Sequence, residues 1–313
     1  MITYLKHEEI DKKKWDSTIQ HAFNGIIYAY SWYLDIIHPY WDALVENDYE
    51  RVMPLPVSKK WNVKYIFQPF FSQQLGVFSK TILYPNTVTN FIQAIPKDVK
   101  LVQINLNSYN KTAGNSVTTT PHINYLLDLI NKYPQSQKHY STNLKRNLKK
   151  ADKARLQLLK TVKPEEIVTL FRENRGKEIK HWHNHHYLRL QHLMYMAIHK
   201  GKGIMFGAYS KSNILLAAAF FLKSHNRLTF LFSGQSQRGR EVAALAFIID
   251  SVIQQFSPGN FTLDFEGSDN KGLARFYKGF GAKETTYYCI HINKLPFPQS
   301  LLYAVKKRLK TTT

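Results

Sequence analysis

Three apolar runs in the second half of the chain predict strands at Ile204–Tyr209, Ile214–Leu222 and Arg227–Phe232. The connectors between them, Ser210–Asn213 and Ser224–Asn226, are short and polar. Connectors of this kind join neighbouring antiparallel strands, so the three runs predict two successive hairpins.

Apolar positions three and four residues apart predict helices around these strands. The other predicted elements of this half are the helices Ser141–Lys150, Tyr187–His199 and Val242–Phe256, a helix opened by Pro164, a short helix from Asn270 to about Lys278, and the strands Arg155–Val162, Phe261–Phe265 and Thr285–Asn293. This alternation is typical of a mixed sheet flanked by helices.

The first half repeats the order of paired strands, helix and strand without repeating the residues. Its predicted elements include the strands Ile2–Leu5, Asp42–Glu46, Arg51–Val57, Tyr65–Phe71, Gln73–Phe78 and Leu101–Leu106 and the helices Lys12–His21, Tyr30–Ile37 and Val88–Ile95. A polar stretch with a proline, residues 131–140, separates the halves. We therefore expect an α/β (α+β) chain of two tandem domains, 1–136 and 137–313, each a mixed, mostly antiparallel twisted sheet flanked by helices.

Charge distinguishes the two halves. The 313 residues include 43 Lys and Arg against 22 Asp and Glu, a formal charge of +21. Residues 1–136 carry 13 basic and 11 acidic side chains, whereas residues 137–313 carry 30 and 11. A surface rich in lysine and arginine attracts the phosphates of coenzymes, nucleic acids or membrane headgroups. For any single lysine, a contribution to solubility is an equally good explanation. Leu301–Lys310 is expected to form a basic amphipathic helix.

Composition excludes several classes of protein. A hydrophobic content of 44% suffices for packed cores and excludes general disorder. The single cysteine, Cys289, excludes a disulfide framework and a cysteine-based zinc cluster, and favours a cytoplasmic location. The longest apolar run, Ile214–Leu222, is about half as long as a membrane-spanning helix, and the first residues contain no apolar signal core.

The block from Leu263 to Ala282 carries the most specific motif. Asn270 follows a strand, Tyr277 comes seven residues later, and Gly281 four residues after that. Seven residues are about two helical turns, so Asn270 and Tyr277 are expected on one helix face. A helix cap and a buried aromatic residue would explain the same pair.

This spacing resembles the closing motif of the GNAT superfamily of acyl-CoA N-acyltransferases, in which phenylalanine usually follows the glycine, where this chain has Ala282. In that family the asparagine contacts the pantetheine arm of coenzyme A, and the tyrosine protonates the departing thiolate. The resemblance implies these roles for Asn270 and Tyr277.

A predicted strand, a loop containing Arg238-Gly239-Arg240 and a helix from about Glu241 precede the motif. Glycine and a helix N-terminus allow backbone N–H groups to approach phosphate. GNAT enzymes bind the coenzyme A pyrophosphate here with the pattern Gln/Arg-x-x-Gly-x-Gly/Ala. This chain matches the pattern only in part, because Glu241 occupies the position of the final glycine or alanine. The resemblance implies that acetyl-CoA or another acyl-CoA contacts Phe232, Ser233, Gly234, Arg238, Gly239, Arg240 and Asn270.

Two further groups of residues could serve the reaction. Glu266, at the end of a strand, could act as the general base for an amine acceptor, or could be a surface carboxylate. The His181–His186 segment lacks the spacing of a metal site, so no metal is expected. In GNAT proteins the corresponding region walls the acceptor pocket, which makes Trp182, His183 and His186 candidates for substrate contact.

Two alternatives to an acyl-CoA-dependent N-acyltransferase remain open. The tandem arrangement and the basic stretch Tyr140–Ala151 resemble the FemAB-like branch, whose Fem-type transferases take an aminoacyl group from aminoacyl-tRNA. The excess charge of residues 137–313 suits a tRNA partner because phosphate contacts dominate affinity for nucleic acids. The other alternative is a non-catalytic GNAT-fold module that binds an anionic surface through Lys138–Lys163.

Overall fold

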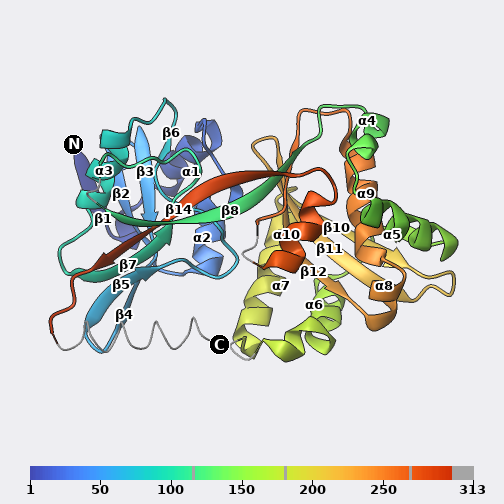
Figure 1. Ribbon diagram of the computed structural model, residues 1–313. Helices are drawn as coiled ribbons and strands as arrows, with labels where there is room; N and C mark the ends of the chain where they lie inside the picture. Colours follow the sequence, from blue (N-terminus) through green and yellow to red (C-terminus); the bar gives the residue numbers. More distant parts are fainter. Residues whose placement is uncertain (115–116, 180–181, 268–269, 298–313) are drawn as a thin grey trace. The chain divides into compact units, whose positions relative to one another are not determined.

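The computed structural model describes residues 1–114, 117–179, 182–267 and 270–297 (Figure 1). Two compact units divide the chain: unit 1 comprises Met1–His122 and the chain from Thr286, and unit 2 comprises Ile123–Thr285. The expected boundary after residue 136 therefore differs from the division into units. The reason is that two eleven-residue strands, β8 (Thr118–Asp128) and β14 (Lys283–Asn293), each begin in one unit and end in the other. The expected C-terminal helix at 301–310 lies outside the described residues.

Unit 1 contains two sheets. Its helices are α1 (Lys12–His21), α2 (Ser31–Ile37) and α3 (Pro85–Gln93), and its strands other than β8 and β14 are β1 (Ile2–Leu5), β2 (Asp42–Glu46), β3 (Arg51–Leu55), β4 (Val57–Lys60), β5 (Val63–Phe67), β6 (Phe78–Ser79) and β7 (Val99–Asn105). One sheet has the order β1-β2-β3-β6; in the other, β5 lies between β4 and β7, and β7 also pairs with β14. Residues 73–77 form a loop rather than the expected strand, which is shortened to β6.

Unit 2 contains one mixed sheet with helices on both faces. Its elements other than β8 and β14 are α4 (Tyr133–Lys138), α5 (Thr142–Lys153), β9 (Gln157–Leu159), α6 (Pro164–Glu173), α7 (Asn184–His199), β10 (Gly203–Tyr209), β11 (Leu215–Ser224), β12 (Arg227–Gln235), α8 (Gln237–Glu241), α9 (Ala244–Phe256), β13 (Thr262–Asp264) and α10 (Lys271–Lys278). The strand order is β8-β13-β12-β11-β10-β9, and only the β12–β13 pair is parallel. The expected mixed, mostly antiparallel sheet is thus confirmed.

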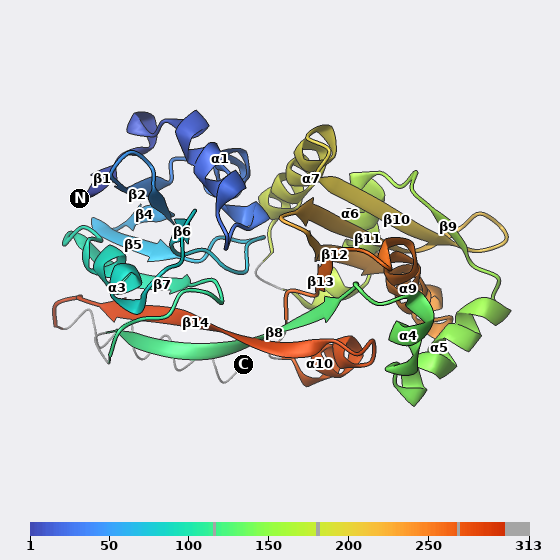
Figure 2. The ribbon, with the colours of Figure 1, turned by 90° about the horizontal axis from the view of Figure 1, so that it is seen from above.

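The two faces of this sheet are covered by different helices, as Figure 2 shows, with α9 on one side and α6 and α7 on the other. The apolar residues of α9, among them Ile249 and Val252, pack with Phe206 and Phe221 in a core that water does not reach. Burial of this apolar surface is the main stabilising contribution to the unit. Asp250 is the acidic residue of α9, and its carboxylate accepts hydrogen bonds from Tyr133 and Tyr140, both at 2.8 Å.

Helix α6 lies against β12 at a glycine. A Cβ atom on Gly234 would lie 2.6 Å from the carbonyl oxygen of Ile167 and 2.8 Å from the backbone nitrogen of Phe171. Backbone atoms cannot move aside as a flexible side chain would, so the close approach of α6 to β12 depends on this glycine.

We therefore expect Gly234→Ala to lower the free energy of unfolding by about 1–3 kcal/mol, as overpacking does. Urea unfolding measures the loss. Gly201→Ala is the control, because no atom lies within 4 Å of its added Cβ and only its left-handed backbone, with φ of 65°, opposes the change. A Gly234→Ala protein as stable as the wild type would contradict the close contact.

Candidate functional site

Strands β12 and β13 run side by side for three residues and then part. Arg227, Leu228 and Thr229 pair with Thr262, Leu263 and Asp264, after which β12 continues along β11 as far as Gln235. β13 instead follows β8 on its other side, and the N–H of Phe265 donates to the carbonyl of Tyr125 at 3.0 Å. The β12 edge from Phe230 to Gln235 has no ladder partner on the β13 side within the described residues.

A buried carboxylate lies at the point where the strands part. Asp264 is 2% exposed, and it accepts hydrogen bonds from Arg227 Nη1 at 2.8 Å, Asn124 Nδ2 at 3.0 Å and the backbone N–H of Glu266 at 2.9 Å. These donors come from β12, from β8 and from the turn after β13. Asp264 therefore fixes the strand ends and the turn that carries Glu266 relative to one another.

The turn after β13 has a left-handed backbone. Glu266 and Gly267 both have φ of 57°. A Cβ on Gly267 would lie 2.1 Å from the carbonyl oxygen of Ile123, so only glycine fits at that position. The turn leaves the carboxylate of Glu266 partly exposed at the end of the strand, where the sequence placed a candidate general base.

A β-bulge in β12 lies beside the parting. Phe221 pairs with Phe230 and Phe220 with Phe232, so Leu231 is the extra residue. Without a bulge, residues two apart on a strand point to the same face. Here Phe230 packs in the α9 core, whereas Phe232 packs against Phe171 of α6 at a ring distance of 4.7 Å.

Tyr277 lies on the α9 side of the parting strands. It is 6% exposed, and its ring stacks on Phe265 at 4.8 Å with an angle of 25° between the planes. Burial and, to a lesser extent, the nearby negative charge of Glu266 raise the pKa of the Tyr277 hydroxyl above its usual value. The hydroxyl therefore carries its proton at neutral pH.

The other residues of the motif have local structural roles. Asn270 is the N-cap of α10, and its Oδ1 accepts from the N–H groups of Gly272 at 2.9 Å and Leu273 at 3.2 Å. Gly281 has φ of 84°, which favours glycine. Asn270 and Tyr277 thus belong to the start and the last turn of one short helix.

The segment expected as a phosphate loop is helical. Ser236 caps α8 by accepting from the N–H of Gly239 at 3.0 Å, and a Cβ on Gly239 would lie 2.2 Å from the carbonyl oxygen of Leu216. Arg238, 71% exposed at its side chain, forms an ion pair with Glu241 at 3.1 Å. The longer helix α9 begins only at Ala244, after Ala243 with φ of 58°, and no side chain caps it.

The residues expected in an acceptor pocket are brought onto the α6 side of β12. Trp182 stacks on Phe232 with ring centres 6.1 Å apart and also contacts Tyr187 at 5.3 Å. His186 is buried, and its Nδ1 accepts from the N–H of His183 at 3.0 Å, so the two histidines cap α7. Burial lowers the pKa of His186. His181 lies outside the described residues, among which no group of three His, Cys, Asp or Glu could hold a metal ion.

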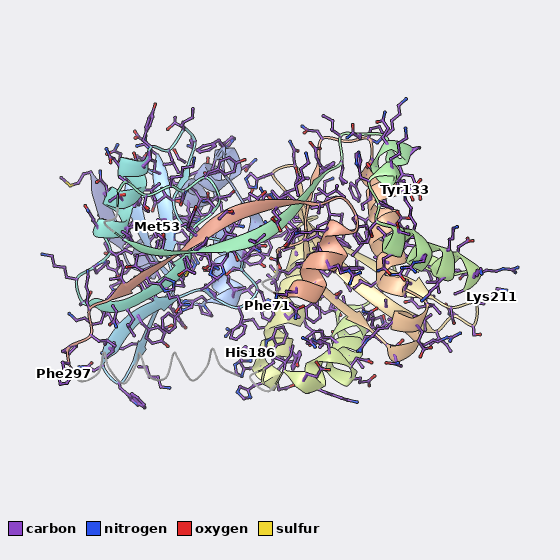
Figure 3. The ribbon with its side chains drawn as sticks, viewed as in Figure 1. Met53, Phe71, Tyr133, His186, Lys211 and Phe297 are labelled. Atoms are coloured by element: carbon purple, nitrogen blue, oxygen red, sulfur yellow. The ribbon has the colours of Figure 1, made fainter. Side chains whose placement is uncertain are left out.

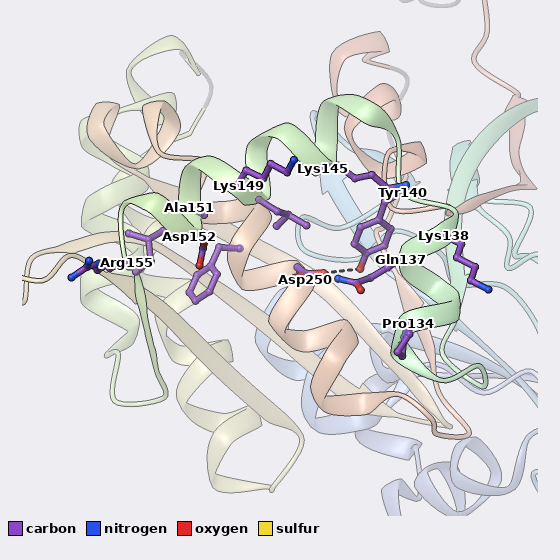
Figure 4. Close-up of a pocket in the computed structure, with 13 residues that line it drawn as sticks. Pro134, Gln137, Lys138, Tyr140, Lys145, Lys149, Ala151, Asp152, Arg155 and Asp250 are labelled. Atoms are coloured by element: carbon purple, nitrogen blue, oxygen red, sulfur yellow. Dashed lines mark hydrogen bonds between the residues drawn. The ribbon is translucent and has the colours of Figure 1, made fainter.

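A groove of about 920 Å³ lies between α4, α5 and α9 (Figure 4). Its cations are Lys138, Lys145, Lys149 and Arg155. None of the four forms an ion pair with another described residue. Apolar side chains, including Leu148 of α5 and Phe247 of α9, complete the lining.

Sequence reasoning did not single out Asp264, Arg227 or Phe265, which hold the candidate residues in place. Arg227 and Asp264 are 37 residues apart, and no local pattern links them. The only sequence signals were an acidic residue in a predicted strand that is otherwise largely apolar and an arginine at the start of another predicted strand.

Comparison with known proteins shows the fold. No family model matches the chain, and no curated protein matches it in sequence. Among solved structures, FemX is similar with a TM-score of 0.64 and 10% identity over 92% of this chain and 96% of that one. The C-terminal domain of a putative lysylphosphatidylglycerol synthetase from Agrobacterium fabrum is similar with a TM-score of 0.56 and 12% identity over 94% and 95%.

A tandem GNAT protein from the clavulanic acid biosynthesis pathway is similar with a TM-score of 0.51 and 12% identity over 95% of this chain and 99% of that one. These likenesses extend over nearly the whole chain. The chain therefore has a tandem GNAT-like fold, as the Asn270–Tyr277–Gly281 spacing and the repeated order of elements predicted, and it has FemAB-like structural relatives, as the tandem arrangement and the basic stretch Tyr140–Ala151 predicted.

Removal of the Asp264 carboxylate should lower the free energy of unfolding. Asp264→Ala leaves Arg227, whose side chain is 20% exposed, without its charged partner, so we expect a loss of about 3 kcal/mol or more in the free energy of unfolding. Glu178→Ala is the matched control, because its ion pair with Arg175 is 63% and 61% exposed and should contribute less than about 1 kcal/mol. Equal losses in the two variants, measured by urea unfolding, would contradict the role given to Asp264.

Proposed function

We propose that this protein is a GNAT-type N-acyltransferase in which an amine attacks the acyl donor directly. The observation that carries the proposal is the parting of β12 from β13 with Tyr277 and Glu266 beside it. Backbone N–H groups along the β12 edge beyond the paired residues suit a carbonyl oxygen that becomes negatively charged in the transition state. The fold is compatible with other activities, so the proposal rests on this arrangement of residues.

Glu266 and Tyr277 would each transfer one proton. Glu266 takes the proton that the amine loses as its nitrogen bonds to the acyl carbon, directly or through a water. When the tetrahedral intermediate collapses, the bond from the acyl carbon to the leaving sulfur or oxygen breaks. Tyr277 then gives its proton to that leaving atom, for which its raised pKa keeps the hydroxyl protonated.

Coenzyme A is the first candidate for the donor's carrier. Its phosphates would approach the first turn of α9, where backbone N–H groups lack a side-chain cap and the helix dipole is positive. Arg238, Gly239 and Arg240 come just before that turn, and Ser233 and Gly234 lie on the adjoining end of β12. Asn270 would flank the pantetheine arm, whereas the Phe232 side chain packs against Phe171 of α6, so Phe232 would contact the donor through its backbone.

A tRNA is the second candidate, favoured by two observations. Glu241 adds a carboxylate close to the expected pyrophosphate position and engages Arg238, which disfavours a diphosphate there. The groove between α4, α5 and α9 offers four cations that could contact a phosphate backbone. A Fem-type aminoacyl transfer, as the likeness to FemX suggests, would use such contacts.

The aromatic cluster on the α6 side supports an acceptor site there. Trp182 and Phe232 stack, and the guanidinium of Arg172 lies 4.6 Å from the ring centre of Tyr187. We propose that Trp182, His183 and His186 wall the place where the amine enters, opposite the Tyr277 side.

Tyr277→Phe tests the chemistry. It retains the stack on Phe265 and removes only the hydroxyl, so we expect kcat to fall about 100-fold or more with little change in KM for the donor. The measurement is release of the donor's carrier in the presence of a panel of primary amines. Tyr195→Phe is the control, because that hydroxyl donates to Glu165 on the surface, at 2.7 Å. Equal rates for Tyr277→Phe and the wild type would contradict the proposal.

Donor binding separates the two candidates. Arg238→Ala should weaken acetyl-CoA binding several-fold if coenzyme A carries the acyl group, whereas Lys145→Gln with Lys149→Gln should have no effect. If tRNA is the carrier, the lysine pair should weaken tRNA binding and reduce its salt dependence by about two counterions. Titration of purified protein with acetyl-CoA and with aminoacyl-tRNA decides between them, and binding of neither would overturn both.

A further inference from the structure

Six lysines gather at one end of a sheet in unit 1. Register places them there: Lys60 pairs with Val63 at the end of the β4–β5 hairpin, Lys64 pairs with Val99 at the start of β7, and the N–H of Lys294 donates to the carbonyl of Lys100 at 2.7 Å. We call this end the lysine edge; its members are Lys59, Lys60, Lys64, Lys97, Lys100 and Lys294.

The lysine edge has a large excess of positive charge. In the segments 57–64, 97–100 and 293–297 the single carboxylate is Asp98, which forms an ion pair with Lys64. Lys59, Lys60, Lys97 and Lys294 are exposed. Exposed like charges on neighbouring segments repel one another, so an anionic partner would relieve this repulsion.

Two aromatic side chains project from the same end. Trp61 is 84% exposed at the tip of the two-residue turn between β4 and β5, where Trp61 and Asn62 have φ of 47° and 63°. Lys60 Nζ lies 5.1 Å from the Trp61 ring centre. Phe297, labelled in Figure 3, is 80% exposed just beyond Lys294. Exposed apolar side chains that gather in one patch mark an interaction surface.

We propose that the lysine edge, with Trp61 and Phe297, docks unit 1 onto an anionic lipid bilayer. Tryptophan is enriched at the membrane interface, where its ring lies at headgroup level, and clustered lysines are drawn to anionic headgroups. A hairpin tip projects outward, so its side chains can insert into the flat interface of a bilayer. A protein that binds a polynucleotide instead offers a groove along which the backbone runs. The described part of the chain contains no helix with the length and apolarity of a membrane span.

Co-sedimentation of the full chain with vesicles tests the proposal. The protein should bind vesicles of phosphatidylglycerol and phosphatidylcholine in equal parts, should bind pure phosphatidylcholine poorly, and should dissociate in high salt. Replacement of Lys59, Lys60 and Lys97 by glutamine should weaken partitioning roughly 100-fold, because each lysine near the surface contributes about fivefold. Trp61→Ala should weaken it about tenfold through lost apolar burial.

Matched controls remove the same charge or ring elsewhere. The glutamine variant of Lys177, Lys211 and Lys283, exposed lysines of unit 2, should keep most of the vesicle binding, and so should Tyr84→Ala, a residue that is 69% exposed. Circular dichroism checks that all variants are folded. The proposal is overturned if the control variants lose as much as the lysine-edge variants, if neutral vesicles bind equally well, or if the lysine edge binds only RNA.

Discussion

The buried carboxylate of Asp264 is the interaction on which the arrangement of unit 2 depends. It receives Arg227 from β12, Asn124 from β8 and the backbone of the following turn, and so joins three segments where β12 and β13 separate. Burying a carboxylate is unfavourable unless its oxygens are hydrogen-bonded and its charge is matched, and both conditions are met here. Because β13 is held to β8 while β12 stays with β11, the sheet is divided at this point.

The division has consequences on both faces of the sheet. The bulge at Leu231 sends Phe230 into the α9 core and Phe232 toward α6 and Trp182. Tyr277 stacks on Phe265 on the α9 side of the sheet. The aromatic cluster of Phe171, Trp182 and Phe232 lies on the α6 side. For the acyl transfer that we propose, the donor and the amine would therefore approach the β12 edge from opposite faces.

Local patterns in the sequence predicted much of the fold. The hairpins β10–β11 and β11–β12 follow apolar runs with short polar connectors, and the helix at Tyr277 begins at a good N-cap, Asn270. The sequence did not reveal β8, since Pro121 and several polar residues interrupt its apolar pattern. Because β8 and β14 each run through both units, a boundary based on local composition could not identify the units that tertiary pairing creates.

The candidate site was predicted only in part for the same reason. Tyr277 and Glu266 lie in one short motif, so spacing could associate them, and the charge of Glu266 does reach the Tyr277 hydroxyl. The helical turn at Arg238–Arg240 was not predicted, because the cap supplied by Ser236 competes with the loop geometry that glycine suggested. The role of Asp264 depends on partners that lie on other strands. These partners are far away in the sequence, so no local spacing of residues indicates them.

The central claim is that the acyl donor binds where β12 and β13 part. The most direct test is a crystal structure with a non-reactive analogue of the donor that binds in titration. The account predicts that the acyl carbonyl oxygen lies within hydrogen-bond distance of β12 N–H groups between Phe230 and Gln235, with the leaving atom next to the Tyr277 hydroxyl. An analogue bound only in the groove between α4, α5 and α9, or one whose leaving atom lies far from Tyr277, would contradict it.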